Sequence, residues 1–189
     1  MSAVPTPGQT VGPFFGYALP DPGDAELVPP GRPGALRLFG RVLDGDGAPV
    51  PDALLELRQA GPDGAVPRLP GSLRRDGWTF TGWGRAATDA AGGYTFTTLL
   101  PGALGGAPFF ALAVLARGLL DRLTTRAYPP ATSPQEQAAL AADPLLAAVP
   151  PHRRGTLLAR PEDGGLRFDV VLQGEGETVF LTYPRTPPR

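Results

Sequence analysis

Residues 35–58 read ALRLFGRVLDGDGAPVPDALLELR, and this stretch decides the fold class. Apolar and polar residues alternate over 35–43, which is the period of a strand with one buried face. The Asp-Gly-Asp-Gly run at 44–47 is a turn signal, and the alternation resumes over 52–60. We therefore expect two strands here, joined as a hairpin or meander.

The same pattern continues along most of the chain. Residues 78–102 predict strand, turn and strand, and the nearly continuous apolar run at 109–118 predicts a strand buried on both sides. Residues 120–129 are its expected partner. Further strands are predicted in 155–161 and 166–183, and a polar, glycine-rich insertion spans 61–75.

One segment departs from this pattern, at residues 133–149. Ser133 suits a helix N-cap, Pro134 suits the first turn, and Glu136 stands at capping-box spacing, so a short helix is predicted. Many short strands and one short helix indicate an all-β protein, an antiparallel β-sandwich. We expect an extended N-terminal arm and linker over 1–34 and the sandwich domain over 35–189.

Composition limits the functions open to this chain. Its 189 residues suit one domain, and a formal net charge of -1 gives no sign of nucleic acid or of an anionic membrane surface as a partner. Cysteine is absent, which excludes disulfides and thiol chemistry and fits a reducing cytoplasm. There is neither a leader pattern nor an apolar run long enough to span a bilayer, so we expect a soluble cytoplasmic protein.

The inventory of reactive side chains is poor. His152 is the one histidine, whereas zinc and non-haem iron sites usually take at least two imidazoles from one chain. It lies between prolines and arginines and is read as a surface or interface residue. Tyr94 and Tyr183 are read as packing residues with a bonded hydroxyl. No serine-nucleophile elbow or phosphate loop is present, so the chain alone has no self-sufficient active site.

Three stretches make a family identifiable: 40–60, 84–102 and 166–183. In order and spacing they resemble the core strands of the intradiol ring-cleavage dioxygenases. The opening TPGQTVGPFF at 6–15 and the run ARGLLDRLTTRAY at 116–128 resemble the alpha chain of the family's two-chain members. The resemblance covers about residues 5–183 and implies the intradiol type of β-sandwich.

In this family the resemblance implies a ferric ion held by two tyrosines and two histidines of the homologous beta chain. Here the two histidine positions are occupied by Phe109 and Ala111. The tyrosine positions fall near Ala65 or Val66 and near Ala103 or Leu104. We therefore expect no metal and no catalytic residue in this chain, and Fe(III) in a partner beta subunit.

The implied role is that of an alpha subunit that completes the beta subunit's active site, within a larger alpha–beta assembly. That site would cleave 3,4-dihydroxybenzoate with O2 to 3-carboxy-cis,cis-muconate. By the resemblance Thr10, Gly12 and Pro13, on an arm that contacts the partner, would form part of the substrate pocket wall. Arg126 would lie near the substrate's carboxylate.

Several alternatives stay open at this point. The pattern G-x-V-x-D-x-x-G-x-P-V also occurs in transthyretin-like sandwiches, so a non-catalytic binding module is the second hypothesis. A catalytic chain with relocated ligands is a third, and one histidine argues against it. The arm, with Phe14 and Phe15 as anchors, would in the simplest case only hold two chains together, and Arg126 would only make a surface ion pair.

Overall fold

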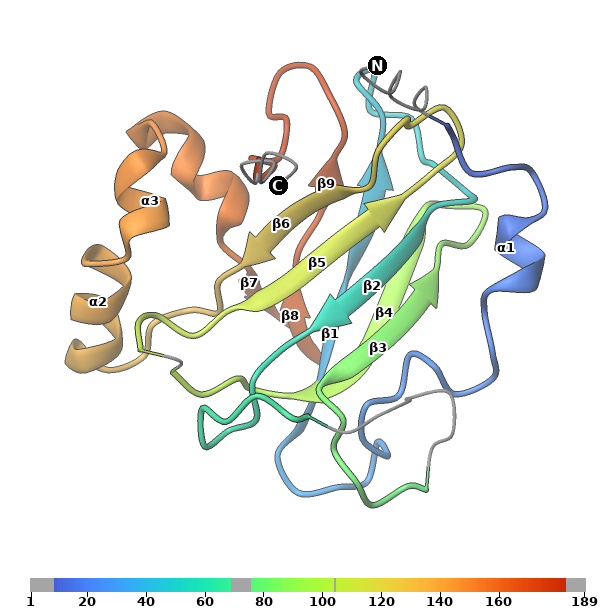
Figure 1. The fold of residues 1–189 in the computed structure, drawn as a ribbon. Helices are drawn as coiled ribbons and strands as arrows, with labels where there is room; N and C mark the ends of the chain where they lie inside the picture. The colour runs from blue at the N-terminus through green and yellow to red at the C-terminus, as the bar shows by residue number, and fades with distance from the viewer. Residues whose placement is uncertain (1–8, 69–75, 104, 183–189) are drawn as a thin grey trace, which may run out of the picture.

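The first of two β-sheets is built around the long strand β1 (Ala35–Leu43). The computed structural model describes residues 9–68, 76–103 and 105–182. β1 pairs antiparallel with β4 (Gly93–Leu99) and parallel with β8 (Gly165–Arg167) and β9 (Val170–Val171), and β7 (Arg160–Glu162) pairs with β8 (Figure 1). The sheet is therefore mixed, because β8 and β9 run parallel to β1 whereas β4 runs antiparallel to it.

The second sheet is antiparallel throughout and has the order β3-β2-β5-β6. Its strands are β3 (Trp83–Ala87), β2 (Leu54–Arg58), β5 (Phe110–Leu115) and β6 (Leu123–Ala127). The pairing of β5 with β6 confirms the predicted partner of the 109–118 run. The two sheets form the expected sandwich.

The predicted hairpin between the first two strands is wrong. β1 and β2 lie in different sheets, as do β3 and β4. The Asp44 side chain closes a local loop by accepting hydrogen bonds from the backbone N–H groups of Asp46 and Ala48, at 2.9 and 2.8 Å. After that loop the chain crosses to the other sheet. Alternation identifies which face of a strand is buried, but it does not identify the neighbouring strand.

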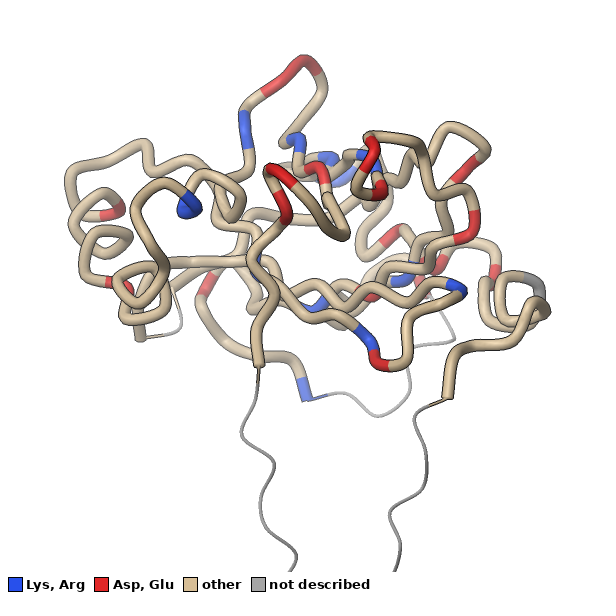
Figure 2. Tube along the Cα trace, turned by 90° about the horizontal axis from the view of Figure 1, so that it is seen from above, with Lys and Arg blue, Asp and Glu red and all other residues tan. Residues whose placement is uncertain are grey.

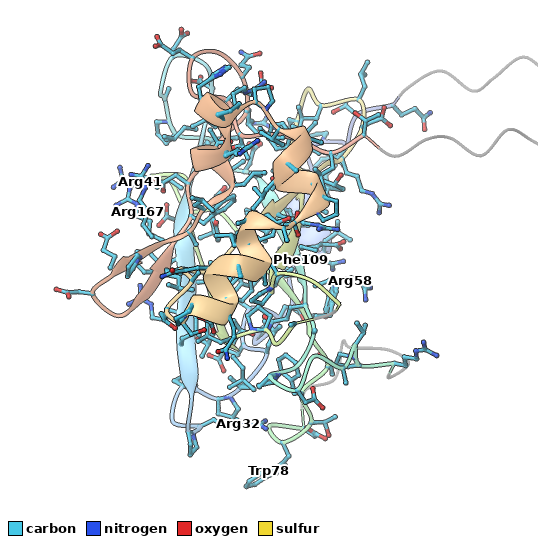
Figure 3. The ribbon with its side chains drawn as sticks, turned by 90° about the vertical axis from the view of Figure 1, so that its left-hand side faces the viewer. Arg32, Arg41, Arg58, Trp78, Phe109 and Arg167 are labelled. Atoms are coloured by element: carbon cyan, nitrogen blue, oxygen red, sulfur yellow. The ribbon has the colours of Figure 1, made fainter. Side chains whose placement is uncertain are left out.

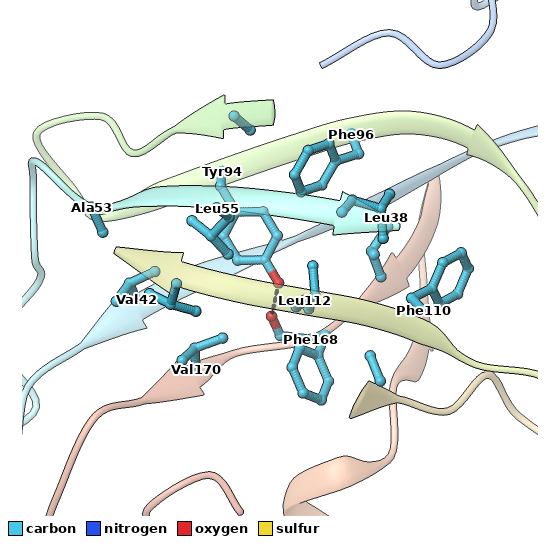
Figure 4. Packing of buried hydrophobic residues seen from close by; sticks show 14 of the residues in the cluster. Leu38, Val42, Ala53, Leu55, Tyr94, Phe96, Phe110, Leu112, Phe168 and Val170 are labelled. Carbon is cyan, nitrogen blue, oxygen red and sulfur yellow. Dashed lines mark hydrogen bonds between the residues drawn. The ribbon is translucent and has the colours of Figure 1, made fainter. Parts of the chain in front are cut away.

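The core lies between the two sheets (Figure 4). Its largest fully buried side chains include Leu38 and Phe96 from the first sheet and Leu55, Phe110 and Leu112 from the second. Along β5 buried and partly exposed residues alternate strictly. The prediction that this strand is buried on both sides is therefore wrong. The run is apolar because alanines occupy two of its outward positions, and no second core formed by the described residues covers that face.

Three α-helices and a 3-10 helix occur in the described part of the chain. α1 (Phe15–Ala18) lies in the arm, and α2 (Pro134–Ala141) begins with the predicted capping box at Ser133. The predicted single helix is in fact two, because Asp143 caps a new helix, α3 (Pro144–Ala148). No helix within 9–68, 76–103 and 105–182 is long and apolar enough to cross a bilayer.

The C-terminal strand predictions hold only in part. Residues Pro151–Leu157 form a 3-10 helix, so the strand predicted from residue 155 begins only at Arg160. The strand predicted over 166–183 is reduced to the short β8 and β9. Prolines at 150 and 151 and the glycines at 174 and 176 interrupt the ladders that alternation alone would extend.

Candidate functional site

The outward face of the second sheet carries the candidate site. Arg58, Ala111 and Arg126 stand in register across β2, β5 and β6, and therefore point to the same face. A cavity of about 390 Å³ opens there. Its lining comprises Glu56, Arg58, Phe109, Ala111, Leu112, Ala113, Arg122, Thr124, Thr125 and Arg126.

Phe109 and Ala111, the two predicted histidine-ligand positions, lie together in this cavity. A phenyl ring and a methyl group have no lone pair to give to a metal ion. No cluster of three or more His, Cys, Asp or Glu side chains that could hold a metal occurs in the portion of the chain that the structure describes. The residues present therefore do not fit a ferric ion.

The two predicted tyrosine-ligand positions also lie close together in the fold. A side-chain carbon built on Gly64 would lie 2.2 Å from the carbonyl oxygen of Ala103, so the 61–65 loop packs directly on residue 103. Ala65, Val66 and Ala103 carry no oxygen in their side chains. Leu104 lies outside the described residues.

Arg126 is held from two sides. Its Cζ atom lies 3.8 Å from the centroid of the Phe109 ring, which is a close cation–π contact. Its Nη1 atom donates a hydrogen bond of 3.3 Å to the hydroxyl of Tyr128, and that hydroxyl donates one of 3.1 Å to Asp143 Oδ1. Burial raises the pKa of Tyr128, so the phenol is neutral near pH 7.

Positive charge dominates this cavity. The side chains of Arg58 and Arg122 form no hydrogen bond or ion pair with any residue that the structure describes, the cavity's one carboxylate, Glu56, included. Glu56 is engaged elsewhere, since Arg85 Nη2 lies 2.7 Å from Glu56 Oε1. Figure 3 shows Arg58 and Phe109 on this side and Arg41 and Arg167 on the opposite side of the molecule. The chemistry of the cavity therefore favours an anion.

The N-terminal arm lies at a different place. The Thr10 hydroxyl accepts a hydrogen bond of 2.9 Å from the N–H of Gly118, which lies in the loop that joins β5 to β6. Gly12 is exposed, and no atom of the described residues lies within 4 Å of the place where its side chain would start. Pro13 lines a cavity together with Arg117 of the same loop. The arm segment that carries Thr10, Gly12 and Pro13 therefore lies at the loop end of the β5–β6 hairpin, whereas Arg126 lies at the other end. In Figure 1 this segment precedes α1.

The arm's two phenylalanines differ. Phe15 is buried, whereas Phe14 is 75% exposed and lines a cavity of about 420 Å³ with Asp52 and Arg117. Those two residues form a salt bridge beside the arm. Phe15 therefore packs within this chain, whereas the Phe14 ring is exposed and could pack against another chain.

Tyr94 behaves as the packing interpretation expects. Tyr94 is buried, and its hydroxyl is bonded within the core. Tyr183 lies outside the described residues. His152 is exposed on the 3-10 helix, and acidic and basic residues are scattered over the described surface rather than gathered on one side (Figure 2).

Sequence reasoning missed the groups that surround Arg126. Tyr128, Arg58, Arg122 and Asp143 were not predicted as parts of the site. The period-two register of β2 was a usable signal, since it places Arg58 on the outward face. Nothing local connects Asp143 with Tyr128, because their contact depends on how α3 packs.

The fold and the site define a dioxygenase-type β-sandwich. The family model described as "Dioxygenase" matches residues 12–132. A solved dioxygenase domain from a carbohydrate-binding fusion protein of Streptomyces sp. SirexAA-E is similar, with a TM-score of 0.56, 28% identity, and coverage of 90% of this chain and 99% of that one. The chain belongs to this family, the intradiol ring-cleavage dioxygenases.

Within the family, the sequence is similar to a particular kind of chain. The protocatechuate 3,4-dioxygenase alpha chain of Burkholderia cepacia is 39% identical, over 93% of this chain and 96% of the relative. The protocatechuate 3,4-dioxygenase beta chain of the same organism is 33% identical, over 74% of this chain and 64% of the relative. The match to the alpha chain is thus both closer and more complete.

Proposed function

We propose that this chain is the non-metal-binding alpha subunit of a protocatechuate 3,4-dioxygenase, which completes the active site of an iron-bearing beta subunit. The observation that carries the proposal is the pair Phe109 and Ala111, which fill the ligand positions inside an otherwise family-like fold. The similarity to an alpha chain over nearly the whole length supports it. A transthyretin-like binding module gives no reason for that similarity.

The proposal assigns the Fe(III) to the beta subunit, because the residues of this chain do not fit it. The pair would cleave 3,4-dihydroxybenzoate with O2 between its two hydroxyl-bearing carbons, giving 3-carboxy-cis,cis-muconate. This chain then contributes binding and orientation rather than chemistry at the reacting atoms. Its lack of cysteine suits the reducing cytoplasm, where we place the enzyme.

The arm over residues 1–34 is assigned to the interface with the beta subunit, and the sandwich over 35–189 supports it. Thr10, Gly12 and Pro13 would form part of the substrate pocket wall. Their exposure supports this role, and the empty space at Gly12 lets another backbone or an aromatic ligand approach closely. Phe14, exposed in the single chain, would be buried by the partner.

Arg126 is assigned to the carboxylate of the substrate. A guanidinium meets a carboxylate with two parallel hydrogen bonds, and a remote charged group of this kind orients the ring for reaction. The surplus positive charge of the cavity supports the assignment. Because Arg126 and the arm lie at opposite ends of the β5–β6 hairpin, they reach one substrate molecule only if the arm reorients on assembly, and otherwise they serve pockets of two beta subunits.

The test is co-purification followed by oxygen uptake. The chain is produced alone and together with a beta chain, and each preparation is given 3,4-dihydroxybenzoate. We expect a large alpha–beta complex that consumes O2 and a single chain that does not. A chain that stays monomeric in the presence of the beta chain would contradict the proposal, as would turnover by the single chain.

A further inference from the structure

The corner of the fold where a catalytic chain would hold its metal contains a guanidinium in this chain. The Arg126 group stacks on the Phe109 ring at 3.8 Å, well inside the distance at which a cation is attracted to an aromatic face. We propose that Phe109, Tyr128 and Asp143 are positioning residues that hold Arg126 as the carboxylate-binding group of the cavity on the outward face of the second sheet. This inference rests on the proposed function, in which Arg126 meets the substrate's carboxylate.

Tyr128 fixes the direction of the guanidinium. The Tyr128 side chain is fully buried, and its ring packs against Phe109 with centroids 6.0 Å apart. Its hydroxyl has one proton, which it donates to Asp143 Oδ1, so its oxygen is left to accept the hydrogen bond from Arg126 Nη1. Rotation of the hydroxyl away from Asp143 would remove one of the three hydrogen bonds that Asp143 Oδ1 accepts.

Asp143 is itself held in place by helix α3. Its carboxylate is buried, and Oδ1 accepts hydrogen bonds from the N–H groups of Leu145 at 2.9 Å and Leu146 at 3.1 Å. These are the first N–H groups of the helix, which lack partners of their own. A continuous path of hydrogen bonds therefore runs from the start of α3 through Tyr128 to Arg126.

This path prepares Arg126 for an anion. A free arginine side chain loses much rotational freedom on binding, and a side chain already held in one orientation loses less. Asp143 contacts Arg126 only through Tyr128, and Glu56 is engaged by Arg85, so neither carboxylate pairs directly with the guanidinium. Arg58 and Arg122 line the same cavity and add to its positive potential. A flat aromatic carboxylate fits this combination of aromatic wall and cations.

The experiment uses the assembled alpha–beta complex and two probes that are not catechols and are therefore not cleaved. The first is 4-hydroxybenzoate, and the second is its neutral analogue 4-hydroxybenzamide. Calorimetry gives the dissociation constant of each, and their ratio measures recognition of the carboxylate. The variants are Arg126→Ala, Phe109→Leu, Phe109→Tyr and Tyr128→Phe.

We expect Arg126→Ala to abolish the preference for the carboxylate. Phe109→Leu removes the aromatic face and should weaken 4-hydroxybenzoate binding about five-fold, with little effect on the amide, while Phe109→Tyr restores it. Tyr128→Phe keeps the ring and removes only the hydroxyl, and it should weaken binding about three-fold. Gel filtration and circular dichroism verify assembly, and Tyr128→Phe carries the test if Phe109→Leu does not fold.

The outcomes separate this inference from the function on which it rests. If Arg126→Ala leaves the preference for the carboxylate unchanged, the proposed role of Arg126 is wrong, and the inference falls with it. If Arg126→Ala removes the preference while Phe109→Leu and Tyr128→Phe both retain the wild-type ratio, the role of Arg126 stands, and the positioning network is refuted.

Discussion

The hydroxyl of Tyr94 donates a hydrogen bond of 2.5 Å to the backbone carbonyl of Phe168 inside the core (Figure 4). Tyr94 belongs to β4, and Phe168 lies between β8 and β9, so the bond ties the C-terminal strands to the other edge of the first sheet. Both side chains are buried. The bond is therefore a polar link across an apolar core.

Replacing Tyr94 by phenylalanine tests that link. The variant leaves the Phe168 carbonyl without this donor in a buried site, and we expect the free energy of unfolding to fall by about 1–2 kcal/mol. Urea denaturation measures it. Because burial raises the pKa of Tyr94, the loss should be the same from pH 6 to pH 9. Thr95→Val, at the exposed neighbouring position of β4, is the control and should have little effect.

Gly40 provides a second test of the same region. A side-chain carbon at Gly40 would lie 1.9 Å from the Phe168 carbonyl oxygen, so the backbone would have to move to make room for it. We expect Gly40→Ala to lower the free energy of unfolding by about 1–3 kcal/mol or to prevent folding. Gly106→Ala is the matched control, since no atom lies within 4 Å of its added carbon. Equal thermal stability of the two variants would show that this close approach does not exist in solution.

Much of the fold could be predicted from the sequence. Alternation located the strands of the second sheet and most of the first, because each strand buries one face. It could not show that β1 and β2 lie in different sheets, since the Asp44 turn closes locally in either arrangement. The division of the 133–149 helix followed from Asp143, whose capping role became evident only from its hydrogen bonds.

The candidate site, too, could be predicted from the sequence only in part. The resemblance to the family implied that Phe109 and Ala111 stand at the two histidine-ligand positions, and these two residues do share one cavity. The separation of the arm from Arg126 could not be predicted, because it depends on which end of the β5–β6 hairpin the Thr10 hydroxyl contacts. The path through Tyr128 joins residues 15 positions apart and depends on tertiary packing.

The loop at residues 76–79 should respond to acid. The Thr79 hydroxyl and the N–H groups of Thr79 and Trp78 donate to the Asp76 carboxylate and lower its pKa from 3.8 to about 2. Since the folded pKa is the lower one, the loop is stabilised above pH 3.8, and this stabilisation is lost as the pH falls toward 2. The amide resonances of Trp78 and Thr79 should move over that range. Asp76→Ala should remove the transition, and its persistence in that variant would assign it to another group.

The arm should show its function only in the assembly. Because none of the residues that the structure describes occupies the space at Gly12, Gly12→Ala should leave the thermal stability of the single chain unchanged. In the alpha–beta complex the added methyl group should raise KM for 3,4-dihydroxybenzoate by about three-fold or more, because it would crowd the pocket wall. Gly31→Ala, also exposed and free of neighbours, is the control. An unchanged KM for Gly12→Ala would limit the arm to holding the two chains together.

The central claim is that this chain shapes a binding site and leaves the metal to its partner. Elemental analysis of iron, on the chain purified alone and on the alpha–beta complex loaded under the same conditions, tests it most directly. We predict a negligible iron content in the single chain and about one iron per alpha–beta pair in the complex, because Phe109 and Ala111 supply no ligand. Stoichiometric iron bound tightly by the single chain would contradict this account.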